Sequence, residues 1–183
     1  MTAPSALSTP YANLSLRPVL PGLFLATMTL LFGFGLGVVF GLNEDAIKSR
    51  LSASAAAAPP TVYQQDEAAM KAVLEKSWVY MQRAHLHAGS LGAVAVALTL
   101  LVVFLRTGPG VARMISLGLG AGGLGYSVFW LWAGFRAPAL GSTGAAKESL
   151  SWLAIPSAGL VVAATLGVAG LLALALVTPR RSA

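Results

Sequence analysis

Two histidines lie close together in the segment RAHLHAGSLGAV, residues 83–94, and they are the only histidines in the chain. An imidazole nitrogen is a common ligand of metal ions. Successive residues of an α-helix are about 100° apart, so His85 and His87 point to nearly opposite sides of a helix and do not readily clamp one ion together. The spacing therefore allows two ligand sites back to back, or one site and one surface residue.

The histidines open one of four apolar stretches that dominate the chain. The 183 residues are 56% hydrophobic and only 10% charged, which is outside the range of soluble domains. Each stretch exceeds the roughly 20 residues needed to cross the hydrocarbon core of a bilayer. We therefore predict an all-α integral membrane protein, a bundle of four transmembrane helices at residues 18–42, 84–105, 111–133 and 150–177.

Small residues recur every fourth position in all four stretches. Such spacing lets helix backbones approach closely in lipid and predicts a tight bundle. The positions are Gly33, Gly37 and Gly41, then Ala84, Ala88 and Gly92, then Gly118 and Gly122, and finally Ala163 and Gly167.

The largest segment outside the apolar stretches is residues 43–83, between the first two spans. Its first part, 43–60, ends in the Ala/Pro tract SASAAAAPP and is expected to be a linker, whereas residues 64–83 are predicted to form a helix continuous with the second span. One side of this extension is apolar and has no lipid to face, so another chain, a second copy or the folded-back linker must cover it. Met70, Leu74 and Trp78 are the candidate partner-binding residues.

Charge placement predicts the orientation in the cell (inner) membrane. Five basic residues and no acidic ones lie on one side, in the two tails and around the loop that joins the second and third spans: Arg17, Arg106, Arg113, Arg180 and Arg181. By the positive-inside rule both termini are cytoplasmic, which leaves residues 43–83 and the loop 134–149 exoplasmic. The net charge of +6 is then explained by the membrane topology. The sequence has no stripe of basic residues interleaved with aromatic ones, so we expect no nucleic-acid partner.

The segment HLHAGSLG, residues 85–92, resembles the His-x-His helix of the haem–copper oxidase catalytic subunit, the cbb3-type form especially. In that family the two histidines of this helix serve different haems, one on each face. The resemblance implies that His85 and His87 are axial haem ligands, with haem b as the candidate cofactor. The family has many more spans and further histidines for copper and for the second axial position, which this chain lacks, so the second ligand would come from Met81, a partner subunit or a symmetry mate.

Other chemistry has few residues to carry it. The absence of cysteine excludes disulfides, thiolate metal sites and iron–sulfur clusters, and no phosphate-binding loop, zinc-protease motif or intramembrane carboxylate is present. The alternative for the histidines is a structural or interfacial role. Four tryptophans on the predicted outer side, Trp78, Trp130, Trp132 and Trp152, are interpreted as an aromatic belt.

Two functions follow from these patterns. The first is a small non-catalytic membrane subunit, haem-binding through His85, His87 or Met81, in a respiratory or other redox assembly of several membrane subunits or a homo-oligomer. The alternative is a structural or assembly protein without a cofactor that docks a partner through its exoplasmic helix.

Overall fold

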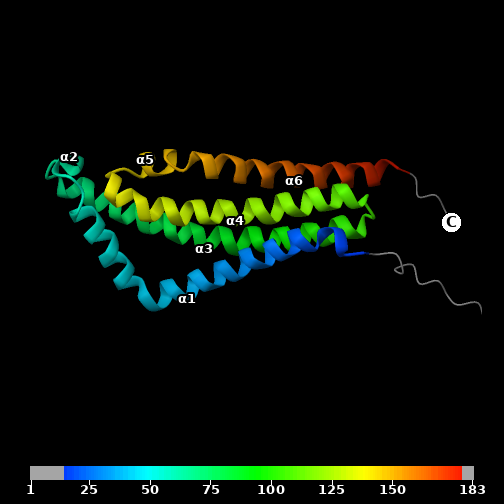
Figure 1. The fold of residues 1–183 in the computed structure, drawn as a ribbon, viewed down its shortest axis with the longest axis horizontal. Coiled ribbons are helices and arrows are strands. Elements are labelled where there is room, and N and C mark those ends of the chain that lie inside the picture. Colours follow the sequence, from blue (N-terminus) through cyan, green and yellow to red (C-terminus); the bar gives the residue numbers. More distant parts are fainter. Residues whose placement is uncertain (1–14, 179–183) are drawn as a thin grey trace, which may run out of the picture.

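The computed structural model describes residues 15–178, and every secondary-structure element in that range is helical. The four long helices are α1 (Leu20–Ala56), α3 (Glu67–Phe104), α4 (Pro109–Leu140) and α6 (Ser151–Val177). The short elements are a 3-10 turn, η1 (Arg17–Val19), and the helices α2 (Pro60–Tyr63) and α5 (Thr143–Glu148). Figure 1 shows the long helices lying roughly along one axis, with α2 and α5 together at one end, called here the α2–α5 end. The predicted all-α four-helix bundle is confirmed.

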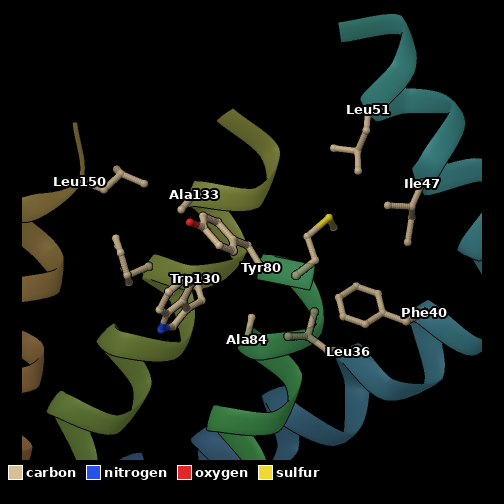
Figure 2. Packing of buried hydrophobic residues seen from close by; sticks show 11 residues of the cluster. Leu36, Phe40, Ile47, Leu51, Tyr80, Ala84, Trp130, Ala133 and Leu150 are labelled. Carbon is tan, nitrogen blue, oxygen red and sulfur yellow. The ribbon is translucent and has the colours of Figure 1, made fainter. Parts of the chain in front are cut away.

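The helices α3 and α4 form the centre of the bundle. α1 packs against both of them, whereas α6 lies along α4 and touches α3 at few positions. One cluster of buried apolar side chains, around Met81 and Trp130, lies toward the α2–α5 end, and a second, around Val102 and Leu119, lies toward the opposite end. Figure 2 shows the first cluster, in which Phe40, Ile47 and other α1 side chains point toward α3.

The outer faces of the long helices are apolar and exposed. All four helices are long and apolar enough to cross a membrane. Large apolar side chains stay exposed along them, among others Phe24, Leu31, Phe34, Leu86, Val94, Leu160, Leu166 and Leu174. Apolar surface of this extent is stable against lipid and not against water. The chain is a multi-pass membrane protein.

Close backbone contacts join the helices where small residues recur. A Cβ atom at Gly122 would lie 2.7 Å from the carbonyl oxygen of Ser157 on α6, and one at Gly33 would lie 2.8 Å from the amide nitrogen of Gly89 on α3. Only glycine fits at such distances, so the tight packing predicted from the repeats is confirmed at these two positions. Gly41 has nothing within 4 Å of its added Cβ and takes no part in a helix contact.

The second span and the helix before it form one unbroken helix, α3, as predicted. Its 38 residues correspond to a length of about 57 Å. The helix begins at Glu67, and not near Gln64, because Gln64 and Gln65 have positive φ angles of 50° and 65°. Asp66 caps the new N-terminus by accepting a hydrogen bond of 2.8 Å from the amide of Ala69.

The segment expected to be a linker, residues 43–60, is helical as far as Ala56. The helix bends at Asn43 (φ −133°, ψ 24°), whose side-chain Nδ2 donates to the carbonyl oxygen of Val39 at 3.1 Å. Beyond the bend, visible in Figure 1, the distal half of α1 returns toward α3 and buries Ile47 and Leu51. Of the three ways to cover the apolar side of the α3 extension, the folded-back segment is therefore present within the chain.

The helix α4 also continues past its predicted span, from residue 133 to Leu140. It ends at Gly141, which adopts a left-handed conformation with φ 62°. Ser142 caps the short helix α5, which precedes α6, by accepting a hydrogen bond from the amide of Ala145. Tyr63 on α2 donates a 2.6 Å hydrogen bond to the carbonyl oxygen of Pro138, which ties α2 to the end of α4.

The tryptophans divide into two groups. Trp132 and Trp152 are exposed and lie edge to face, with ring centroids 6.2 Å apart, as members of an aromatic belt. Trp130 is only 9% exposed, so the belt interpretation is wrong for this residue, because α3 covers its ring. Trp78 is half-buried against Phe40, with ring centroids 5.3 Å apart. The predicted tails lie largely outside the described residues, as do Arg180 and Arg181.

Candidate functional site

His85 fills the contact between α3 and α1. Its Nδ1 atom lies 2.8 Å from the carbonyl oxygen of Gly33. Because a carbonyl oxygen can only accept, Nδ1 carries the proton, and the neutral ring then keeps its lone pair on Nε2. A Cβ at Gly37 would stand 2.8 Å from Cε1 and 3.6 Å from Nε2 of the same ring. The ring thus occupies space that Gly37 leaves free, so this position of the α1 repeat accommodates a side chain, whereas Gly33 accommodates the backbone of α3.

His87 faces a different neighbour, α4. Its ring is half-buried, with its centroid 5.2 Å from that of Tyr126 and 6.1 Å from that of Trp130. The two imidazoles therefore address two different helices, as the angular separation along α3 requires. The structure does not bring them to one point.

Met81 is fully buried at the contact between α3 and α4. A Cβ at Gly134 would lie 2.6 Å from the Cγ atom of Met81, so glycine at this position makes room for the methionine side chain. Met81 belongs to the apolar cluster that includes Leu51 and Tyr80. Its role in the structure is that of a core side chain, for which the flexible thioether is well suited.

The three candidate haem ligands do not together form a haem site. His85 is hydrogen-bonded inside the α1–α3 contact, His87 packs on α4, and Met81 is enclosed in the core. A haem on Nε2 of His85 would have to displace α1, because the ring lies against Gly37. Within residues 15–178 no group of three His, Cys, Asp or Glu side chains is placed to hold a metal ion. The arrangement favours helix packing over ligation for these side chains.

A cluster of cationic and aromatic side chains lies at the α2–α5 end of the apolar span of α3. The Cζ atom of Arg83 is 5.0 Å from the ring centroid of Trp130 and 5.5 Å from that of Tyr80. The Nζ atom of Lys147 on α5 is 5.9 Å from the Tyr80 centroid. These distances are those of cation–π contacts. This cluster is not predicted from the sequence. Tyr80 and Arg83 are three residues apart and are neighbours on one helix face, but Trp130 and Lys147 join them only through tertiary folding.

The predicted partner-binding residues line a groove between the distal half of α1 and the extension of α3. One hollow of about 440 Å³ is formed by Leu51, Leu74, Trp78 and Val79, with Lys48, Ser52 and Glu75 at its edge. A second hollow, of about 500 Å³, is lined by α3 alone, at Met70 and its neighbours, and shares Leu74 with the first. Lys48 is paired with Glu44 and stands 5.4 Å from the Trp78 ring centroid. The structure thus places Met70, Leu74 and Trp78 along one surface, called here the α1–α3 groove.

No protein-family model, curated protein sequence or solved structure matches this chain.

Proposed function

We propose that this protein is a non-catalytic membrane subunit with a structural or assembly role, and that the α1–α3 groove docks a helical segment of another membrane protein. The groove is the observation that carries the proposal. It joins two hollows through Leu74 and is lined by residues from Glu67 to Val79 of α3, a distance of about 18 Å or three helical turns. A groove of this length and shape suits one face of an α-helix.

The composition of the groove indicates the chemistry of the occupant. Its floor is apolar, and its edges carry both signs of charge, with Lys71 and Glu75 on α3. The apolar span predicted for α3 begins at residue 84, so the groove continues the bundle beyond the lipid-facing stretch. An amphipathic helix with an apolar stripe and mixed charges at its margins matches these features better than an acyl chain does.

Catalysis and haem binding receive less support from the described residues. His85 and His87 are both engaged in contacts between helices, and the described residues lack a cluster suited to a metal ion. We therefore favour the structural role over the haem-binding one. The distribution of basic residues supports an exoplasmic location for the α2–α5 end, where the partner would be met outside the cytoplasm.

A site-specific crosslinking experiment in the native membrane tests the docking role. A photoreactive amino acid at position 74 should give one discrete product with another protein, and the same probe at Ala69, which is exposed on α3 and lines neither hollow, should not. The additional substitution Val79→Gln should weaken the product, because it makes the groove wall polar. A product of twice the chain mass would assign the groove to a second copy, and adducts with lipid alone would assign it to the bilayer; either result contradicts the proposal.

Optical absorption separates the structural role from the haem-binding one. The protein purified after expression with haem supplied should show no Soret band. A Soret band that disappears in His85→Ala or His87→Ala would overturn the structural proposal and support ligation.

A further inference from the structure

We propose that the cluster formed by Arg83, Lys147, Tyr80 and Trp130 binds the phosphate headgroup of an anionic phospholipid, whose acyl chain lies along the exposed face of α3. This inference does not depend on the docking role of the α1–α3 groove.

The positive charge of the cluster is not balanced by carboxylates. Arg83 and Lys147 both stand within 6 Å of the Tyr80 ring, and Arg83 also stacks on Trp130. Within residues 15–178, neither Arg83 nor Lys147 forms an ion pair with a carboxylate. Glu148 follows Lys147 in sequence but forms no ion pair with it. Two cations thus border the same aromatic ring without a carboxylate partner, which favours an external anion.

The cluster lies at the ends of the predicted apolar spans. Arg83 comes directly before the apolar run 84–105, and Trp130 lies one turn inside the end of the apolar run 111–133. These are positions where phospholipid headgroups meet a transmembrane bundle. Tyr80 and Trp130 are both buried, pack edge to face with ring centroids 4.8 Å apart, and both lie against the guanidinium of Arg83. The cation is therefore preorganised for a phosphate, which an arginine binds through paired N–H donors.

An exposed, largely apolar strip follows the cluster along α3. Leu86, Ser90 and Val94 follow Arg83 at helical spacing and are all exposed, Leu86 at 63% and Val94 at 47%. This face of α3 is covered by neither α1 nor α4. It offers an apolar strip for an acyl chain directly beneath the charged headgroup, a combination that a site for free phosphate would not need.

Lipid retention and thermal stability of the purified full-length protein test this assignment. Phosphatidylglycerol added to the delipidated protein should raise its melting temperature more than phosphatidylcholine does, and native mass spectrometry should show phosphatidylglycerol retained. Each basic side chain near an anionic surface contributes about a fivefold change in affinity, so Arg83→Gln combined with Lys147→Gln should weaken binding by about 25-fold. Without lipid, the double variant should melt slightly below the unmodified protein, because it loses only the small contribution of cation–π contacts made by exposed side chains.

The matched control removes two other cations. Arg50 and Lys71 are exposed, and Lys71 lies about 18 Å along α3 from Arg83, beyond a Debye length of about 8 Å. Arg50→Gln combined with Lys71→Gln should keep the response to phosphatidylglycerol. An equal response to both lipids, an equal loss in the control variant, or full stabilisation by glycerol phosphate without acyl chains would each overturn the proposal.

Discussion

The contact between His85 and Gly37 gives the most specific test of how this bundle is held together. A methyl group added by Gly37→Ala would stand 2.8 Å from Cε1 of the His85 ring, closer than an ordinary van der Waals contact. The ring must then move by several tenths of an ångström, which lengthens its 2.8 Å hydrogen bond to the Gly33 carbonyl. Overpacking of this kind typically costs about 1–3 kcal/mol.

Removing the ring should reverse the effect of the methyl group. His85→Ala alone loses one hydrogen bond between helices, which averages about 0.6 kcal/mol in a bilayer, and leaves a void, for a total cost of roughly 1–2 kcal/mol. In that variant the space beside Gly37 is free, so adding Gly37→Ala should cost nothing or restore part of the loss. The double variant should therefore be more stable than the sum of the single changes by about 1–3 kcal/mol.

These four proteins, the unmodified chain, the two single variants and the double variant, form a double-mutant cycle. Their free energies of unfolding can be measured by reversible unfolding in mixed micelles, followed by tryptophan fluorescence. Gly41→Ala is the matched control, because its added Cβ meets nothing within 4 Å, and it should combine additively with His85→Ala. The reasoning is refuted if Gly37→Ala and His85→Ala are additive within about 0.5 kcal/mol, or if His85→Ala leaves stability unchanged.

Three further predictions concern other parts of the bundle. Gly122→Ala should destabilise the protein by about 1–3 kcal/mol in the same unfolding assay, because its Cβ would meet an α6 carbonyl oxygen at 2.7 Å, whereas Gly159→Ala, with open space around it, should not; equal effects would contradict the close contact of α4 and α6. Burial raises the pKa of Tyr63 above its ordinary value of 10, so its contribution to stability is present below pH 10 and is lost as the pH rises through the raised pKa. Melting temperatures between pH 9 and about 11.5 should therefore fall more steeply for the unmodified protein than for Tyr63→Phe, and parallel curves would count against this account. Reporter fusions after Arg106 and at the C-terminal end should both report cytoplasmic locations and a fusion at residue 55 an exported one; an exported C-terminal signal would contradict the predicted orientation.

The candidate site illustrates which contacts a sequence can predict. The angular separation of His85 and His87 follows from helix geometry alone, and the structure directs them to α1 and α4, respectively. The resemblance to a haem-binding helix rests on eight residues and says nothing about what lies beside each ring. The carbonyl of Gly33 and the aromatic ring of Tyr126 are 52 and 39 residues away from these histidines in sequence, so a local pattern does not reveal them.

The class of the protein, the four spans and the continuity of α3 are predictable from the sequence, because each depends on local hydrophobicity, length and the absence of a helix breaker. What covers the extension of α3 depends on contacts between distant segments. The composition of residues 43–56 is compatible both with a linker and, because of its alanines, with a helix. The segment is helical in the structure, where Ile47 and Leu51 bury their side chains against α3. Tertiary structure likewise determines that Trp130 is enclosed in the core and that Lys147 joins Arg83 at one aromatic ring. Burial and charge convergence depend on which helices become neighbours, and that information lies in packing between distant segments and not in the spacing along any one of them.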